Sequence, residues 1–133
     1  MTNSLRLLPA VAGLLAWLST PASAQSVDPS FYYKLSTQFR GNGMKLDVFN
    51  GGANNNQPHL VKCGNFTGQF WNIMVSEDGD RVRLTTKFRG PGMCLDIFNG
   101  GVNDNQPHVV SCANFTGQLW TLMKTDKRVE GPP

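Results

Sequence analysis

Apolar residues occur along the chain in short runs, which are separated by clusters of glycine, asparagine and proline. Such runs are typical of β-strands, because Gly, Asn and Pro end strands and form the turns between them. Asp78-Gly79 lies between two apolar runs and predicts the turn of a β-hairpin. The pattern predicts an all-β fold with these strands: Phe31–Phe39, Met44–Phe49, His59–Cys63, Phe70–Val75, Arg81–Phe88, Met93–Phe98, His108–Cys112 and Leu119–Met123.

The chain contains one unit twice, as residues 33–75 and 82–124. The two copies align at a constant offset of 49 positions, which separates Asp47 from Asp96. A repeat of this length is one supersecondary unit, which buries its apolar face against its neighbour. No shift of the sequence gives a third copy, so we expect one domain of two repeats within residues 25–133.

The first 24 residues predict a secretory signal peptide. Their single charge, Arg6, precedes an apolar run from Leu7 to Leu18, and small residues offer cleavage near Ala24. A membrane anchor would need about 18 to 20 apolar residues, and this run is shorter and is interrupted by Pro9. We therefore expect a secreted or periplasmic protein whose mature chain starts after Ala24 and has no membrane span.

The net positive charge of the chain is too small to indicate a nucleic-acid partner, because 12 Lys and Arg residues stand against 9 Asp and Glu residues. Such a balance is compatible with a neutral ligand such as a sugar. The sequence has no nucleophile elbow, no metal-binding helix and no phosphate loop. Asp47 and Asp96 occupy equivalent places in separate copies, whereas a glycosidase needs two carboxylates beside one bond. We therefore expect a binding protein that is not an enzyme and uses no cofactor.

Each copy ends in a Gln-x-Trp motif and carries a Leu-Asp pair upstream. These residues are Gly68-Gln69-Phe70-Trp71 and Gly117-Gln118-Leu119-Trp120, with Leu46-Asp47 and Leu95-Asp96 upstream and Cys63 and Cys112 closing the third strands. With these motifs the chain resembles the ricin-B-type lectins and the related family 13 carbohydrate-binding modules, over nearly all of residues 33–124. The resemblance implies a β-trefoil-like fold, in which three such units surround a pseudo-threefold axis. With two units in this chain, we expect a partial trefoil or one that a homo-oligomer completes.

Three cysteines in an exported chain leave at least one without an intramolecular partner. The resemblance implies a disulfide between Cys94 and Cys112, because family members pair a cysteine just before Leu-Asp with one that ends the third strand. The first copy has Lys45 in place of the first of these cysteines, which leaves Cys63 alone. We expect Cys63 to be a small buried residue, and an intermolecular disulfide is the alternative.

The resemblance also implies a shallow sugar site in each copy. An aspartate accepts hydrogen bonds from sugar hydroxyls, a third-strand polar residue assists it, the motif glutamine orients it, and an aromatic ring packs on the apolar face of the sugar. The usual aromatic position holds Val61 or Val110 here, so Phe49 and Phe98 are the candidate platforms, with core packing as the alternative. The predicted sugar-binding residues are Asp47, Phe49, Asn50, His59, Gln69, Asp96, Phe98, Asn99, His108 and Gln118.

Other features leave alternatives open. The motif glutamines follow Gly68 and Gly117, where sugar-binding members often carry asparagine. Asn50 and Asn99 could contact hydroxyls or satisfy local turns, and the aspartates could instead cap a turn or a strand end. The motif tryptophans are expected in the core. We expect a secreted carbohydrate-binding module, and the alternative is a non-catalytic trefoil scaffold or protein-interaction module that has lost sugar binding.

Overall fold

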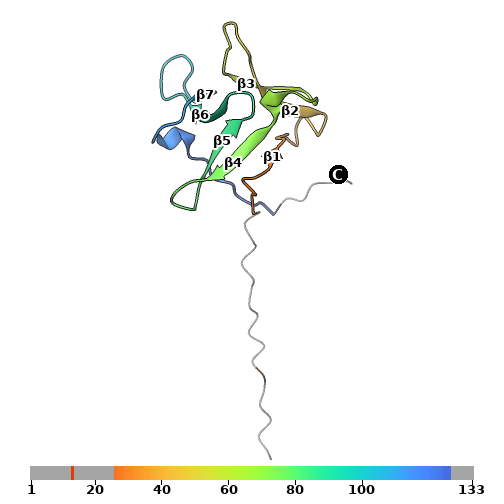
Figure 1. Ribbon diagram of the computed structural model, residues 1–133, viewed down its shortest axis with the longest axis vertical. Coiled ribbons are helices and arrows are strands. Elements are labelled where there is room, and N and C mark those ends of the chain that lie inside the picture. The colour runs from red at the N-terminus through yellow and green to blue at the C-terminus, as the bar shows by residue number, and fades with distance from the viewer. Residues whose placement is uncertain (1–12, 14–25, 127–133) are drawn as a thin grey trace, which may run out of the picture.

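The computed structural model describes residue 13 and residues 26–126, so the predicted signal peptide lies outside the described residues apart from Gly13. The described chain is all-β, as the pattern predicts, with two short 3-10 helices beside the strands (Figure 1). The strands are β1 (Tyr32–Tyr33), β2 (Met44–Val48), β3 (Pro58–Lys62), β4 (Trp71–Val75), β5 (Val82–Thr86), β6 (Gly90–Ile97) and β7 (Pro107–Ser111). The helices are η1 (Thr67–Gln69) and η2 (Thr116–Gln118). No helix among the described residues is long and apolar enough to cross a membrane.

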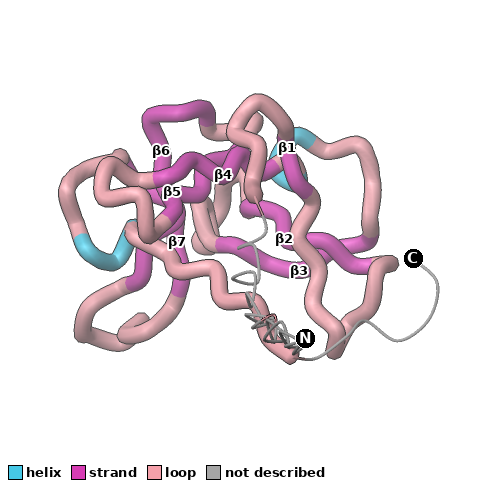
Figure 2. The backbone as a smooth tube through the Cα atoms, turned by 90° about the horizontal axis from the view of Figure 1, so that it is seen from below, coloured by secondary structure: helices cyan, strands magenta, loops and turns pink. Residues whose placement is uncertain are grey.

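The strands form a five-stranded antiparallel sheet in the order β1-β4-β5-β6-β7 and a separate hairpin of β2 and β3. Figure 2 shows β5, β6 and β7 of the second copy to one side of β4, and the β2–β3 hairpin of the first copy to the other. Asp47 lies opposite His59 in the first copy, and Asp96 lies opposite His108 in the second. Corresponding hairpins therefore pair in the same register and present equivalent residues at equivalent places.

The hairpin turn predicted at Asp78-Gly79 joins β4 to β5. The Gly79 N–H donates to the Ser76 carbonyl at 2.9 Å, and the φ of +76° at Gly79 is a left-handed conformation that favours glycine. The Asp78 carboxylate accepts hydrogen bonds from the Ser76 hydroxyl and, at 2.8 Å, from Arg81. This turn leads the chain directly from the first copy into the second.

The first predicted strand, Phe31–Phe39, is reduced to the two residues of β1. These two residues pair with β4, and Leu35 still accepts the Leu46 N–H at 2.8 Å. The chain then turns, because the Gly41 N–H donates to the Thr37 carbonyl at 2.9 Å. The prediction located the strand correctly but extended it through this turn.

The predicted strand Leu119–Met123 is wrong, because only Trp120 forms a bridge, to Val82. Its counterpart in the first copy, β4, is a full strand that pairs along its length with β5 of the next copy. The strand that would pair with Leu119–Met123 in this way would belong to a third copy. As a result Leu122 is 53% exposed, whereas its counterpart Ile73 is buried.

The core forms around Trp71, which has no exposed surface. Its Nε1–H donates to the Leu46 carbonyl at 2.9 Å, and Trp120 makes the equivalent bond to the Leu95 carbonyl at 3.0 Å. Trp71 thus lies in the core, as expected, whereas Trp120 is only partly buried. The buried core consists of Val48, Trp71, Ile73, Val82, Leu84, Leu95 and Val109, and Trp120 packs against it partly buried.

The loop that precedes β3 adds contacts between the two copies to the pairing of β4 with β5. An Arg89 guanidinium nitrogen donates to the Asn55 side-chain oxygen at 2.6 Å and to the Phe49 carbonyl at 3.5 Å. The Val109 N–H donates to the carbonyl of Asn56 at 2.8 Å. These bonds fix the first-copy loop against the second copy.

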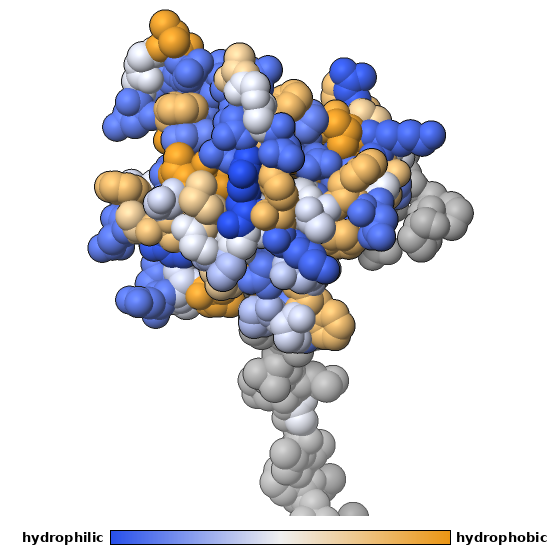
Figure 3. Space-filling model, turned by 45° about the horizontal axis from the view of Figure 1, so that its top comes forward, coloured by the Kyte–Doolittle hydropathy of each residue, from blue (hydrophilic) through white to orange (hydrophobic). Residues whose placement is uncertain are grey.

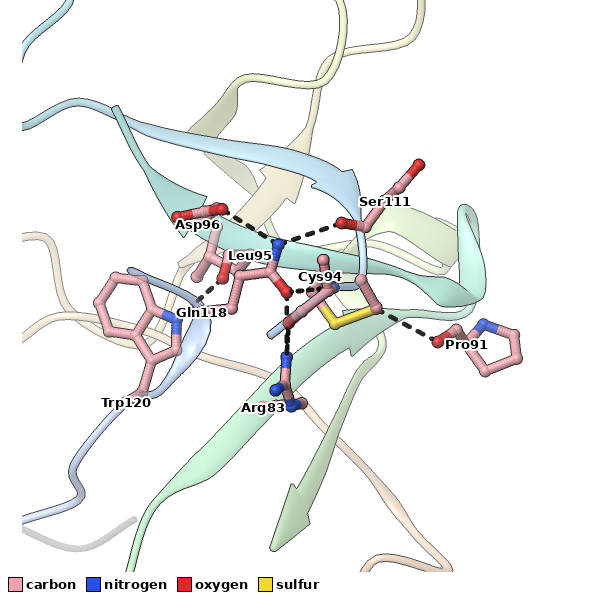
Figure 4. The surroundings of a disulfide bond; sticks show 10 residues. Arg83, Pro91, Cys94, Leu95, Asp96, Ser111, Gln118 and Trp120 are labelled. Atoms are coloured by element: carbon pink, nitrogen blue, oxygen red, sulfur yellow. Dashed lines mark hydrogen bonds between the residues drawn. A yellow bond between two sulfur atoms is a disulfide. The ribbon is translucent and has the colours of Figure 1, made fainter. Parts of the chain in front are cut away.

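The predicted disulfide between Cys94 and Cys112 is confirmed, with the two Cα atoms 4.9 Å apart (Figure 4). It joins β6 to the residue that follows β7. The expectation that Cys63 is buried is wrong, because its thiol is free and exposed. Cys63 directly follows β3 at the surface, and the first copy has Lys45 at the position that Cys94 occupies in the second, so the equivalent disulfide cannot form.

Candidate functional site

Each copy carries a cavity beside its hairpin, and the two are built from largely equivalent residues. The first has a volume of about 310 Å³ and is lined by Asp47, Val48, Phe49, Asn50, His59, Phe66, Thr67, Gly68 and Phe88. The second has a volume of about 400 Å³ and is lined by Asp96, Ile97, Phe98, Asn99, Asp104, Asn105, Phe115, Thr116 and Gly117. Most of the residues predicted to bind sugar thus line one of two cavities, whereas Val61 and Val110 line neither.

The aspartates form the polar floor of the cavities. Asp47 and Asp96 are 9% and 8% exposed, so each carboxylate is largely withdrawn from solvent. One oxygen of Asp47 accepts the Val48 N–H at 2.7 Å, and one oxygen of Asp96 accepts the Ile97 N–H at 2.7 Å. An ionised carboxylate has about four acceptor positions on its two oxygens, so each aspartate keeps capacity for further donors.

The glutamine of the second copy holds its aspartate directly. The side-chain nitrogen of Gln118 donates to the Asp96 carboxylate at 3.0 Å and to the Ser111 carbonyl at 3.1 Å (Figure 4). Its oxygen accepts from the Ala113 N–H at 2.9 Å and from Arg83 at 3.0 Å. Gln118 is fully buried, so it positions Asp96 and does not reach the cavity.

The glutamine of the first copy is equally buried but holds a different group. Gln69 donates to the Lys62 carbonyl at 3.0 Å and accepts from the Gly64 N–H at 3.0 Å. These bonds fix the turn that follows β3 and leads to η1. The structure therefore brings glutamine and aspartate together in the second copy, whereas in the first copy the Gln69 side chain bonds to the backbone around the turn after β3.

A phenylalanine and a histidine stack beside each aspartate. The rings of Phe49 and His59 lie 3.6 Å apart at 17°, and those of Phe98 and His108 lie 3.6 Å apart at 19°. Burial lowers the pKa of the His108 imidazole, and the negative charge of Asp96 opposes part of this shift. Both rings of the first stack line their cavity, whereas in the second copy Phe98 lines the cavity and His108 does not.

Sequence reasoning missed the most exposed aromatic residues of the two cavities. Phe66 and Phe115 are 61% and 60% exposed, and each lines the cavity of its own copy. They stand in the repeated Asn-Phe-Thr segment just before the 3-10 helices. The sequence signal available for them is this repetition, and it does not distinguish them from the other repeated residues, because their exposure is set by the fold.

The glycines before the motif glutamines allow the backbone to approach the aspartates. A Cβ atom at Gly68 would lie 1.9 Å from an Asp47 carboxylate oxygen, and one at Gly117 would lie 2.2 Å from the corresponding oxygen of Asp96. A side chain at this place is therefore incompatible with the observed carboxylate position. This contact explains why glycine stands where the resemblance leads one to expect asparagine.

We expect Gly68→Ala and Gly117→Ala each to lower the free energy of unfolding by about 1–3 kcal/mol, the usual cost of overpacking. The added methyl group must displace the carboxylate from its backbone N–H. Urea unfolding of each variant measures the loss. Gly92→Ala is the matched control, because a Cβ at Gly92 meets nothing within 4 Å. Equal urea midpoints for the control and the two variants would contradict the close approach.

A third cavity, of about 440 Å³, lies at the β4–β5 hairpin and contains none of the predicted site residues. It is lined by Ser76, Glu77, Asp78, Arg83, Asn114 and Leu119. Hydrogen bonds from Ser76 and from the Asp80 N–H lower the pKa of Asp78 to about 2. Two charged groups of this cavity are already engaged, since Arg83 donates to the Ala113 carbonyl and to Gln118, and Asp78 accepts from Arg81.

The described residues contain no group of three or more His, Cys, Asp or Glu side chains that could hold a metal ion. On the face shown in Figure 3, hydrophobic residues are scattered among hydrophilic ones. Comparison of the chain with protein-family models, with curated proteins and with solved structures finds no match. The chemistry offered by the two hairpin cavities is hydrogen-bond acceptance by a largely buried carboxylate beside aromatic rings.

Proposed function

We propose that the chain is a secreted carbohydrate-binding module in which each copy offers a shallow sugar cavity. One observation carries the proposal: a largely buried aspartate, beside a Phe–His stack and an exposed phenylalanine, occurs at equivalent places in both copies. Sugars present hydroxyl groups, which need fixed acceptors, together with C–H faces, which pack on aromatic rings. Each cavity provides both kinds of partner.

In the proposed complex, Asp47 and Asp96 accept hydrogen bonds from two hydroxyls of one sugar ring. A bond to an ionised acceptor is stronger than one between neutral groups. The backbone N–H bonds of the aspartates fix the direction of the remaining acceptor positions. Phe66 and Phe115 supply the aromatic platforms, since Val61 and Val110 cannot.

We further propose that the two copies make up two thirds of a β-trefoil. The proposal is supported by the junction between the copies, in which the strand closing one repeat pairs with the strand opening the next. The corresponding segment of the second copy, Leu119–Met123, forms one isolated bridge and no strand, and Met123 there is 80% exposed. Secretion is proposed from the signal-like first 24 residues, and the disulfide is compatible with an oxidising compartment.

We expect glycan-array screening of residues 25–133 to detect saturable binding that the double variant Asp47→Asn, Asp96→Asn lowers at least tenfold. Asparagine keeps the size of the side chain but removes the charge from the acceptor, and hydrogen bonds to charged groups contribute about 1.5–3 kcal/mol each. The array fixes the sugar class, and titration with the strongest immobilised sugar gives the change in affinity.

Asp80→Asn is the control for this test, because it makes the same substitution in the β4–β5 turn, outside both cavities. Binding that the double variant leaves unchanged would show that the sugar uses another surface. If a folded sample binds no glycan on a broad array, the alternative is favoured, namely a scaffold without a sugar ligand.

A further inference from the structure

The two cavities differ in one wall, although their copies are repeats of one unit. The first cavity is lined by Phe88, which belongs to the second copy. The counterpart of Phe88 is Phe39, which is 83% exposed and lines neither cavity. For the second cavity, the residue equivalent to Phe88 would have to come from a third copy. The first cavity is thus composite, whereas the second is built from one copy alone.

The position of Phe88 is fixed by its neighbour. The Arg89 guanidinium lies over the Phe88 ring, with its central carbon 4.2 Å from the ring centre. The same guanidinium donates to Asn55 at 2.6 Å, in the loop of the first copy. Arg40 and Phe39 form a similar stack at 4.6 Å, but both are exposed. The ring of Phe88 is therefore held at the first cavity from both copies.

The loop residue that Arg89 binds also differs between the cavities. Asn55 is occupied by Arg89 and does not line the first cavity. Its counterpart Asp104 lines the second cavity together with Asn105. The first cavity thus has three phenylalanines and one carboxylate, and the second has two phenylalanines and two carboxylates. The first is the better match for a neutral sugar ring, because it offers more aromatic surface and less charge to desolvate.

We propose that the first cavity is the principal sugar site, with Phe88 of the second copy as a specificity-determining wall that packs on a neutral pyranose ring. This inference rests on the proposed function. The first cavity then binds one sugar ring per chain, and the second cavity binds the same sugar with an affinity at least tenfold lower.

Isothermal titration of residues 25–133 with lactose, xylobiose and N,N′-diacetylchitobiose tests the proposal. The expected stoichiometry of the tightest of these is one sugar per chain. Phe88→Ala weakens that binding at least tenfold, and Phe88→Leu, which keeps apolar bulk without a ring face, weakens it as well. The matched control Phe39→Ala leaves it unchanged. Asp47→Asn removes the binding, whereas Asp96→Asn preserves it.

The outcomes distinguish failure of this inference from failure of the proposed carbohydrate-binding function. A folded wild type that binds none of these sugars and is silent on the array overturns the proposed function, and this inference with it. Two equal sites per chain, or equal affinities for Phe88→Ala and Phe39→Ala, overturn only the inference. Circular dichroism of each variant establishes that loss of binding is not loss of fold.

Discussion

Replacing Trp71 by alanine is expected to lower the free energy of unfolding by about 3–5 kcal/mol, the range for a large aromatic residue removed from a core. Trp71 has no exposed surface and lies at the centre of the buried cluster. The substitution also leaves the Leu46 carbonyl without its indole donor. Urea unfolding followed by far-ultraviolet circular dichroism measures the loss through the unfolding midpoint, because this signal reports mainly the backbone, whereas fluorescence would lose the tryptophan itself.

Trp120→Ala is the matched control, and we expect it to cost clearly less. The two residues have the same motif position and the same hydrogen bond to a carbonyl, at 2.9 and 3.0 Å. They differ in packing, because β5 pairs with the strand that Trp71 begins, whereas Trp120 forms one isolated bridge and is only partly buried. Equal losses would contradict this account and would indicate that another segment covers Trp120 in solution.

The contrast between the paired strand β4 and the corresponding segment Leu119–Met123 also explains which strands the sequence could predict. The strands β2, β4 and β7 were each located to within one residue at either end, because apolar runs bounded by Gly, Asn and Pro carry that signal locally. Leu119–Met123 repeats the composition of β4 but is no strand, since pairing needs a neighbour that composition does not encode. Propensity is therefore a weak guide wherever the partner strand is in doubt.

For the site, the duplication was the most informative feature of the sequence. It placed Asp47 and Asp96 at equivalent positions, and the structure gives both a cavity. The orienting role expected of the motif glutamine holds for Gln118, which reaches Asp96, whereas Gln69 is bonded to the backbone around the turn after β3. Side-chain bonding of this kind depends on differences in the surrounding residues that a matched motif does not reveal.

Two aromatic contributions could not be predicted, for different physical reasons. Phe66 belongs to the repeated Asn-Phe-Thr segment, but its exposure depends on how the turn before η1 directs the side chain. Phe88 reaches the cavity of the other copy, and contacts between copies depend on their relative placement. That placement follows from bonds such as the one from Arg89 to Asn55, which no repeat alignment contains.

Removing the disulfide with the double variant Cys94→Ala, Cys112→Ala is expected to lower the free energy of unfolding by about 3 kcal/mol, from the loop-closure entropy of a crosslink of this span. The bond joins cysteines 18 positions apart and connects β6 to the end of β7. Without it the unfolded chain gains conformations while the folded hairpin keeps its strand pairing. Urea unfolding of the variant and the wild type under oxidising conditions measures the difference.

The packing part of this loss can be separated from the crosslink, because Cys94 is fully buried and alanine leaves a small void. Wild type treated with dithiothreitol keeps both sulfur atoms but loses the bond, so its loss of stability reports the crosslink alone. Cys63→Ala is the matched control, because this thiol is free and exposed, and we expect its unfolding midpoint to equal that of the wild type. Reduced wild type that unfolds at the same urea concentration as the oxidised protein would contradict the prediction, since it would mean that the crosslink does not restrict the unfolded chain.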